Sequence, residues 1–267
     1  MLRLKIGKFL GENTRAFDAD GLIVSETEYS RRVFEGWHTH DNYHLTLILR
    51  GGNCEQRKNK ELEAAPGDVL VYRRRELHRN AGTRHPSKNI SLEIEDKFLS
   101  KYQASVPAFD LNSLQSADAK FSLLKIYKEC LTADAQTPAS IHALALALLA
   151  SPLEEISLDK IPPWTKTLRE IINDRWSEVL SLDELSRLLG VHPVTISKKF
   201  PRYFSCTLGE YARKIKLEKA FALLGQPQSS LADIAYTCGF ADQSHLTRAL
   251  KAATGFTPRE FRLFSGG

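Results

Sequence analysis

The sequence predicts an α+β protein of several domains, with a β-rich domain first, a helical layer next and an all-α domain last. Three observations predict this order. Residues 22–94 contain short segments rich in β-branched residues and separated by Gly, Asn, Asp or Pro, which is typical of strands joined by turns. From about Glu95 alanine and leucine replace valine at helical spacing. Pro162-Pro163 then interrupts the pattern, since no helix interior tolerates this pair, and helical periodicity follows almost to the end.

Strands are predicted in "GLIVSETEYS", "HLTLILRGG", "GDVLVYRR" and "NISLEIE", and helices in "EDKFLSKYQ", "ADAKFSLLKIYKECL" and "ASIHALALALLASPL". The last of these carries an alanine–leucine stripe, which suits either an intramolecular core or a dimer contact. We therefore expect a β domain at 1–95, a helical dimerisation or docking layer at 96–155, a linker at 156–163 and an all-α domain at 164–267.

The composition is that of a globular protein. The chain has 267 residues, of which 42% are hydrophobic and 26% charged, enough for two domains that each bury a core. No stretch approaches ~18 uninterrupted apolar residues, so we expect no membrane span. The first fifteen residues lack the apolar segment of a signal peptide. The four cysteines are far apart and form no CxxC, which favours a reducing cytoplasm and no disulfide framework.

Positive charge is concentrated in the C-terminal domain. Residues 164–267 hold 15 Lys and Arg against 10 Asp and Glu, whereas the whole chain holds 37 against 32. Residues 1–163 are therefore neutral overall, and the excess of five positive charges lies in the last 104 residues. This excess indicates a polyanion as a partner of that domain, although five charges alone are weak evidence.

Residues 181–200, "SLDELSRLLGVHPVTISKKF", predict a helix-turn-helix. Ser181 is a good N-cap and Glu184 would complete a capping box. Gly190 ends the first helix, and Pro193 suits the first turn of the second.

Residues 230–255, "SLADIAYTCGFADQSHLTRALKAATG", predict a second helix-turn-helix. Ser229 or Ser230 caps its first helix, Gly239 breaks that helix and Asp242 caps the next. Between the two units "LGEYARKIKLEKAFALLGQ" predicts a long amphipathic helix that exposes Arg213, Lys214 and Lys216. If this helix is rigid, two recognition helices can enter successive major grooves roughly 34 Å apart.

Residues 164–264 resemble the DNA-binding domain of the AraC/XylS family of bacterial transcription regulators. The second unit and its continuation match through Ile234, Ala235, Cys238, Gly239, Phe240, Gln243, Ser244, Arg248, Gly255, Pro258 and Phe261, and the first unit through Leu182, Leu185, Ser197, Phe200 and Tyr211. One departure is Pro201, where the family often has a basic residue that continues the helix. We therefore expect the second helix of the first unit to end at Phe200, which puts a DNA contact by Arg202 in doubt.

The resemblance implies that the outward face of each recognition helix meets DNA. The residues at these positions are Val194, Thr195, Ser197 and Lys198 in the first helix, and Gln243, Ser244, Thr247 and Arg248 in the second. Glutamine can pair with adenine N6/N7, lysine or arginine with guanine O6/N7, and valine or threonine methyl groups with a thymine methyl. The alternative for Lys198 and Arg248 is a contact to phosphate only.

The stretch "WHTHDNYHLTLILRGG" places three histidines before an apolar segment. His38, His40 and His44 share strand parity and so face one side, and His78 follows in "PGDVLVYRRRELHRN". Both stretches are similar to the paired motifs of cupin barrels. Residues 20–95 thus resemble the cupin-like sensor domain common in AraC/XylS regulators, which makes the expected N-terminal fold a cupin-like β-barrel.

These histidines have two readings. Within a regulator they favour a structural or effector-pocket role without metal or other cofactor, and the pocket candidates are Trp37, His38, His40, Tyr72 and His78. The alternative is a metal site of His38, His40, His44 and His78, since imidazoles so arranged could bind Zn, Fe, Ni or Cu.

The resemblance implies a sequence-specific regulator of transcription rather than an enzyme, with no catalytic residues. It would bind promoter or operator double-stranded DNA in the bacterial cytoplasm as a homodimer, act with RNA polymerase and activate transcription in response to a small-molecule effector or partner. The alternatives are a metal-binding sensor or cupin-type metalloenzyme fused to a DNA-binding domain, and an architectural DNA binder. The architectural binder would discriminate weakly between sequences, whereas a regulator is expected to prefer its site by about 10³ or more.

Overall fold

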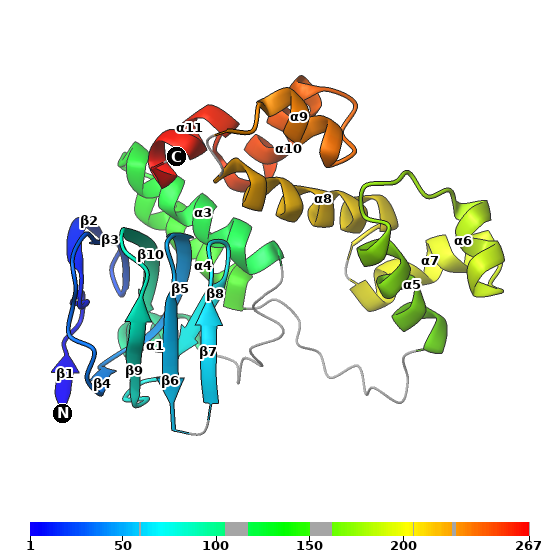
Figure 1. Ribbon diagram of the computed structural model, residues 1–267. Helices are drawn as coiled ribbons and strands as arrows, with labels where there is room; N and C mark the ends of the chain where they lie inside the picture. Colours follow the sequence, from blue (N-terminus) through cyan, green and yellow to red (C-terminus); the bar gives the residue numbers. More distant parts are fainter. Residues whose placement is uncertain (59, 105–116, 150–161, 205, 226–227, 267) are drawn as a thin grey trace. The chain divides into compact units, whose positions relative to one another are not determined.

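The computed structural model describes residues 1–58, 60–104, 117–149, 162–204, 206–225 and 228–266. The chain forms two compact units, the first made of Met1–Ser151 with Lys251–Gly267 and the second of Pro152–Leu250 (Figure 1). Most of the predicted linker, residues 156–161, lies outside the described residues. None of the helices in the described ranges combines the length and the apolar character that crossing a membrane requires.

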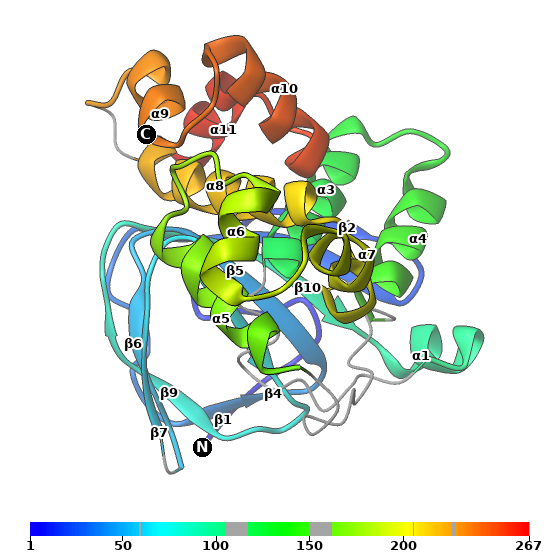
Figure 2. The same ribbon diagram turned by 90° about the vertical axis from the view of Figure 1, so that its right-hand side faces the viewer.

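The first unit contains two five-stranded sheets that face each other (Figure 2). One sheet has the order β1 (Leu2–Leu4), β4 (His38–His40), β9 (His78–Thr83), β6 (Asn53–Arg57) and β7 (Lys60–Ala64). The other has the order β2 (Glu12–Asp18), β3 (Leu22–Tyr29), β10 (Ser87–Ile94), β5 (Tyr43–Arg50) and β8 (Val69–Tyr72). All neighbouring strands are antiparallel except β1 and β4, which are parallel.

The four predicted strands are confirmed as β3, β5, β8 and β10, which all belong to one sheet. Their residues are almost wholly buried, so both faces of each strand favour β-branched and apolar side chains. The strands that were not predicted include β2, β6 and β7, whose sequences "ENTRAFD", "NCEQR" and "KELEA" carry charge at many positions. Such charged strands lie at or near sheet edges, where part of the strand faces water.

Helices cover part of the first unit. The predicted helices are confirmed as α1 (Asp96–Tyr102), α3 (Ala117–Thr132) and α4 (Thr137–Leu149). Helix α3 packs against α4 and against strands β3 and β10. The alanine–leucine stripe of α4 is buried within this unit at Ile141, Ala145 and Leu148, as an intramolecular core would be.

The C-terminal segment packs on α3 and belongs to the first unit. Helix α11 (Pro258–Ser265) places Phe264 against Tyr127 of α3, with ring centroids 4.9 Å apart. Tyr127 donates a hydrogen bond to Glu26 of β3, and Lys128 pairs with Glu260 at 3.0 Å. A buried aromatic contact and an ion pair thus connect the end of the chain to the helical layer.

The second unit is all helical. Its helices are α5 (Pro163–Asp174), α6 (Leu182–Leu189), α7 (Pro193–Phe204), α8 (Leu208–Leu224), α9 (Leu231–Thr237) and the first residues of α10 (Gln243–Thr254). One core cluster comprises Leu168, Ile172, Leu185, Ile196, Phe200 and Ile215. The predicted pair of helix-turn-helix units is therefore present, as α6–α7 and α9–α10, with α8 between them.

The predicted end of α7 at Phe200 is wrong, because the helix continues through Pro201 to Phe204. A proline inside a helix removes one hydrogen bond and crowds the preceding turn. Aromatic packing offsets this cost: Phe200 and Phe204 stack with centroids 4.1 Å apart, and Tyr211 of α8 lies 5.5 and 5.2 Å from them. Residues Arg202–Phe204 are consequently part of the recognition helix.

Candidate functional site

The first recognition helix, α7, has one apolar and one polar face. Ile196 and Phe200 are fully buried in the core of the second unit. Of the predicted DNA-contacting residues, Val194, Ser197 and Lys198 are exposed and Thr195 is half-buried. Val194 is 49% exposed although it is apolar, which leaves a methyl-bearing surface available to a thymine methyl group.

The second recognition helix, α10, repeats this arrangement. Leu246 and Leu250 are fully buried, while Gln243, Ser244 and Arg248 are exposed and Thr247 is half-buried. All eight residues predicted for DNA contact therefore lie on accessible faces of α7 and α10.

Two hydroxyl groups on these faces already donate hydrogen bonds within their own helices. Ser197 Oγ donates to the Val194 carbonyl at 3.2 Å, and Thr247 Oγ1 donates to the Gln243 carbonyl at 2.8 Å. Each hydroxyl hydrogen is thereby engaged, and only the oxygen lone pairs remain. In this arrangement Ser197 and Thr247 can accept from the amino groups of cytosine or adenine but cannot donate.

The predicted capping residues position both first helices. Ser181 Oγ accepts from Glu184 N at 3.1 Å and Ser230 Oγ accepts from Asp233 N at 3.1 Å. The Glu184 carboxylate, however, pairs with Arg175 at 2.7 Å, so only half of the predicted capping box forms. These side-chain acceptors satisfy backbone N–H groups that the first turn leaves free.

The turns that lead into the recognition helices also form as predicted. Gly190 ends α6 with a φ of 63°, a left-handed conformation that favours glycine. Asp242 caps α10 by accepting from His245 N at 2.6 Å. The sequence therefore fixes where each recognition helix begins.

The turn between α9 and α10 contacts the loop that precedes α6. Gly239 has a φ of 66°, and a Cβ there would lie 2.2 Å from the Ser177 carbonyl oxygen and 2.8 Å from Lys216 Nζ. Lys216 donates to the Gly239 carbonyl at 3.0 Å. Lys216 and Lys214, both predicted to be exposed, are half-buried, and burial lowers the pKa of Lys216. Its ammonium group serves as a tertiary cap of the turn.

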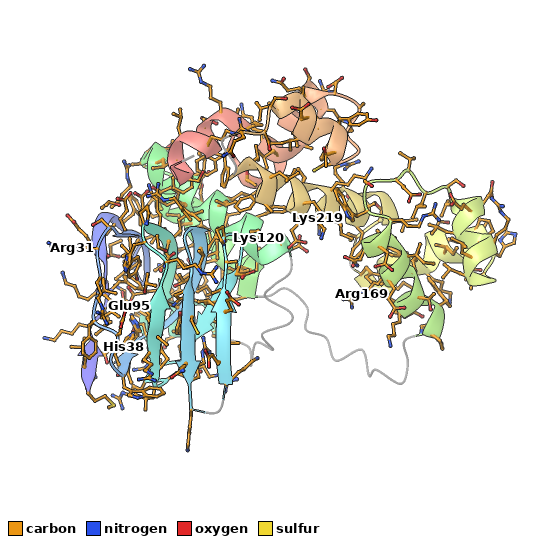
Figure 3. All side chains as sticks on the ribbon, viewed as in Figure 1. Arg31, His38, Glu95, Lys120, Arg169 and Lys219 are labelled. Atoms are coloured by element: carbon orange, nitrogen blue, oxygen red, sulfur yellow. The ribbon has the colours of Figure 1, made fainter. Side chains whose placement is uncertain are left out.

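Helix α8 separates the two helix-turn-helix pairs (Figure 1). Its 17 residues give a length of about 25 Å at 1.5 Å per residue. Lys219 of α8, labelled in Figure 3, lies 5.9 Å from the centre of the Trp176 ring. Trp176 directly precedes Ser177 in the loop before α6. The loop between α5 and α6 thus contacts both α8 and the α9–α10 turn, which connects the two pairs by more than the covalent helix.

The interior of the barrel contains a polar cavity of about 30 Å³. Both sheets line it, with Tyr29, His38, His40, His44, Thr46, Asn53, Tyr72, His78, Asn80, Thr83, Asn89 and Ser91 among its polar residues. A cavity of this size holds one or two water molecules, whereas pockets for drug-sized ligands measure about 300–1,000 Å³. Asn53 Oδ1 and Thr83 Oγ1 are buried and have no hydrogen-bond partner among the described residues.

Four of the predicted pocket residues meet in this cavity: His38, His40, Tyr72 and His78. Trp37 does not join them, because it is 37% exposed and its ring lies 5.3 Å from the Arg79 guanidinium. His44, predicted as part of the alternative metal set, also lines the cavity and stacks on Tyr72 with centroids 4.2 Å apart. His38 is labelled in Figure 3.

The clustered imidazoles are neutral at pH 7. Burial, followed by the neighbouring His78, lowers the pKa of His38 to about 4 and that of His40 to about 3. Burial also lowers the pKa of His78, and it lowers the pKa of His44 far below its ordinary value. Neutral imidazole is the form that binds metal ions and accepts hydrogen bonds.

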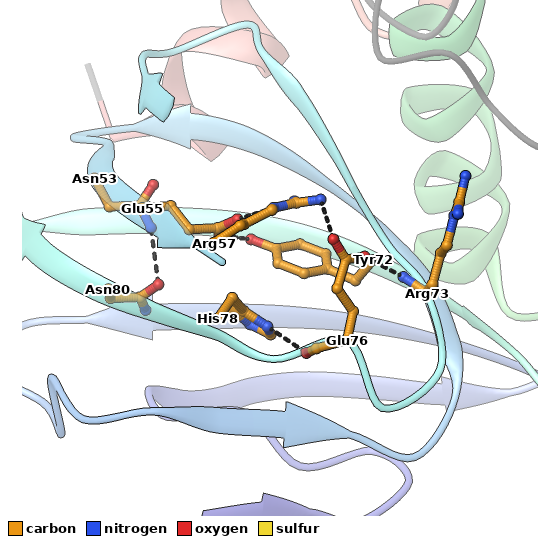
Figure 4. Close-up of polar contacts among 8 residues, drawn as sticks. All are labelled: Asn53, Glu55, Arg57, Tyr72, Arg73, Glu76, His78 and Asn80. Atoms are coloured by element: carbon orange, nitrogen blue, oxygen red, sulfur yellow. Dashed lines mark hydrogen bonds and ion pairs between the residues drawn. The ribbon is translucent and has the colours of Figure 1, made fainter. Parts of the chain in front are cut away.

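A buried charged network supports one wall of the cavity (Figure 4). Glu55, which is 0% exposed, accepts hydrogen bonds from Tyr72 Oη at 2.5 Å and Arg57 Nε at 2.7 Å. Arg57 also pairs with Glu76 at 2.9 Å. Burial and the Glu55 carboxylate raise the pKa of Tyr72 well above its usual range, so its hydroxyl stays protonated.

Sequence reasoning did not identify Glu55, Arg57, Asn53 or Asn80 as cavity or supporting residues. Asn53 donates to Asn80 Oδ1 at 3.0 Å across β6 and β9, and both line the cavity. The signal was weak, because "NCEQR" resembles a solvent-exposed segment as much as a strand whose alternate residues face inward.

Two family models match the chain over most of its length. Residues 21–154 match the AraC-like ligand binding domain, and residues 185–263 match a helix-turn-helix domain. Together with the paired recognition helices, these matches define a DNA-binding transcription regulator with an N-terminal ligand-binding domain. The chain belongs to the AraC family of transcription regulators.

Relatives of known name cover most of this chain. An uncharacterised HTH-type transcriptional regulator of Bacillus subtilis, YbfI, is 25% identical over 223 residues, which are 78% of this chain and 80% of that protein. The HTH-type transcriptional activator RhaS of Escherichia fergusonii is 22% identical over 242 residues, which are 84% of this chain and 86% of RhaS.

Among solved structures, apo ToxT of Vibrio cholerae aligns over 91% of this chain and 97% of its own, at 14% identity and a TM-score of 0.37. An AraC-type regulator of Chromobacterium violaceum aligns over 39% of this chain and 92% of its own, at 25% identity and a TM-score of 0.37.

Proposed function

We propose that this regulator recognises a specific promoter site through both recognition helices of one subunit. The observation that carries the proposal is the matched pair of accessible faces: α7 and α10 each bury two apolar residues and expose the polar residues predicted to meet DNA. The tertiary contact between Ser177, Gly239 and Lys216 supports a fixed relation of the two pairs. Such a relation is needed for two helices to enter adjacent major grooves of one duplex.

We assign Val194, Thr195, Ser197 and Lys198, with Gln243, Ser244, Thr247 and Arg248, to this interface. Exposed basic residues beside them, Lys199, Arg202, Arg213 and Lys251, would contact phosphate oxygens. The domain's excess positive charge suits such a role.

We further propose that the protein acts in the bacterial cytoplasm as a homodimer and activates transcription with RNA polymerase. RhaS is named a transcriptional activator, which supports activation in this chain. A regulatory rather than enzymatic role is supported by the names of YbfI and RhaS. The barrel would respond to a polar effector of only a few atoms, because its cavity measures about 30 Å³ and is lined by polar groups that include the unpartnered Asn53 Oδ1 and Thr83 Oγ1.

Selection of bound sequences from a random double-stranded DNA pool, followed by footprinting, tests the DNA assignment. We expect one preferred site with protection over two turns of DNA per subunit. An unselective protein, or protection of a single turn, would contradict the two-helix interface.

Substitution of Arg248 then tests base recognition at the selected site. Arg248→Ala is expected to weaken binding to that site by about 1–3 kcal/mol if the guanidinium pairs with a base. Arg169→Ala is the matched control, because it removes the same exposed charge from α5 of the same unit. Equal loss of affinity for selected and random DNA would show that Arg248 contacts only phosphate.

A further inference from the structure

Three histidines of the barrel bring ring nitrogen atoms close together. One ligand nitrogen from each of His38, His40 and His78 lies within 4.8 Å of the other two. Strand β4 supplies the first two and β9 the third, and His38 is the register partner of His78. Because strands rather than loops hold all three rings, the positions of their nitrogen atoms are set by the fold.

Hydrogen bonds fix the tautomer of two of these rings. His38 Nδ1 lies 3.0 Å from the Gly36 carbonyl oxygen, and His78 Nδ1 lies 2.9 Å from the Glu76 carbonyl oxygen. A carbonyl oxygen can only accept, so each Nδ1 carries the proton and each Nε2 of the neutral ring presents a lone pair. A ring N–H donated to a backbone carbonyl is the usual support of a metal-ligating histidine.

The third ring has no competing partner. The residues in the described ranges form no hydrogen bond to the His40 ring nitrogens, and the ring's neighbours there are aromatic rings, including those of His38, His44 and His78. The residue is 6% exposed and lines the cavity, so its ring can bind a ligand that enters the cavity without breaking a hydrogen bond to the protein.

The nature of the ligand set indicates which ion fits. Three neutral nitrogens suit Zn²⁺, Cu²⁺, Ni²⁺ or Fe²⁺, whereas Mg²⁺ and Ca²⁺ prefer oxygen. The nearby Glu55 is engaged by Arg57 and Tyr72. Zn–N bonds of about 2.0–2.1 Å place tetrahedral ligand nitrogens roughly 3.4 Å apart. Closure around an ion therefore requires the nitrogens, now within 4.8 Å, to approach by up to about 1.4 Å, a movement within reach of side-chain rotation.

We propose that His38, His40 and His78 bind one divalent metal ion of the Zn²⁺ type, with a further coordination position open to the cavity. The cavity of about 30 Å³ leaves room there for a metal-bound water or a small anion. His44, whose ring centroid lies 4.4 Å from that of His40, borders this open position. The site is built entirely from the first unit, so its existence does not depend on the DNA interface.

Metal binding by the full-length protein tests the proposal directly. After removal of metal with a chelator and dialysis, the protein is titrated with Zn²⁺ and its metal content is measured by elemental analysis. We expect one ion per chain, and with Co²⁺ the visible absorption of a low-symmetry nitrogen site. The variant His78→Gln is expected to bind Zn²⁺ at least about 100-fold more weakly, since loss of even a supporting residue costs 10–100-fold.

The exposed His192 provides the control for binding at surface histidines. His192→Gln should retain one Zn²⁺ per chain with unchanged affinity. The proposal is overturned if the wild-type protein binds no stoichiometric Zn²⁺ at micromolar concentration, or if His192→Gln loses the ion while His78→Gln keeps it. Because the wild-type stoichiometry and Co²⁺ spectrum need no variant, a folding defect of His78→Gln cannot hide either result. Neither measurement involves DNA, so failure here leaves the DNA assignment to its own test.

Discussion

The helical unit directs its functional polar residues outward to solvent, whereas the barrel directs polar residues inward to a cavity. In the recognition helices Ile196 and Leu246 are buried and Lys198 and Arg248 are exposed to solvent. In the barrel, by contrast, alternate residues of β5 such as His44 and Thr46 face the internal cavity, while Leu45 and Leu47 are buried away from it. The difference matters for function: the helical unit offers its chemistry to a large partner, and the barrel offers it only to something small enough to enter.

The largest expected effect concerns the turn that ties the helical unit together. Gly239→Ala would put a methyl group 2.2 Å from the Ser177 carbonyl oxygen at a left-handed φ, so it should destabilise the second unit by about 3 kcal/mol or more and abolish DNA binding. Urea unfolding of the full chain measures this loss.

Substitution of two other glycines distinguishes the cost of the steric contact from the cost of the left-handed φ. Gly190 shares the left-handed φ but has open space around its Cβ position, so Gly190→Ala should cost only about 1 kcal/mol. Gly225 has an ordinary φ of −71° and its nearest contact would be 3.7 Å away, so Gly225→Ala should be close to neutral. If Gly239→Ala costs no more than Gly190→Ala, the approach of Ser177 to the turn is not rigid.

The sequence predicted the helical unit better than the barrel for a physical reason. Its helix starts depend on local residues such as Ser181, Ser230 and Asp242, whose caps are confirmed. The errors at Pro201 and Lys216 arose where distant segments intervene: Phe204 and Tyr211 stabilise the helix past the proline, and the α9–α10 turn buries the lysine.

In the barrel most of the decisive contacts are nonlocal. Both faces of β5 are buried, and its polar residues His44 and Thr46 face the cavity, so the usual rule that the polar positions of a strand face solvent assigns its faces wrongly. The convergence of His38 with His78 requires the pairing of β4 with β9, which sequence alone suggested only through a resemblance. Arg57 lies two residues from Glu55 on β6, but Tyr72 reaches Glu55 from β8 of the other sheet, a contact that sequence alone could not predict.

The second-largest expected effect tests whether the barrel binds a metal ion. If the three-histidine site holds Zn²⁺, free Zn²⁺ at 100 times the dissociation constant should stabilise the first unit by about 2.7 kcal/mol. Thermal unfolding with and without a chelator measures this shift, and His78→Gln should not show it. A stabilisation of equal size in His78→Gln would place the bound ion elsewhere.

A smaller effect is expected from the lysine that caps the α9–α10 turn. Lys216→Met keeps the aliphatic stem but removes the hydrogen bond to the Gly239 carbonyl, which should cost about 1 kcal/mol of unfolding free energy. Lys199→Met, at an exposed position on α7, should change stability by less than about 0.5 kcal/mol. Equal effects of the two substitutions would show that the Lys216 ammonium contributes nothing as a cap.

The smallest expected effect concerns α11, the one segment that follows the helical unit in sequence yet packs in the first unit. Lys128 and Glu260 pair at 3.0 Å with half-exposed side chains, so a double-mutant cycle of Lys128→Met and Glu260→Gln should give a coupling of only about 0.2–1 kcal/mol at pH 7. The Thr257 backbone N–H, and then Lys128, lower the pKa of Glu260 to about 2 from its ordinary 4.5. Because the folded pKa is the lower one, the stabilising contribution of Glu260 is present above about pH 4.5 and is lost as the pH falls toward 2. Lys125→Met on the same helix should show no coupling to Glu260, and a zero coupling for Lys128 as well would show that the Lys128–Glu260 pair adds nothing to stability.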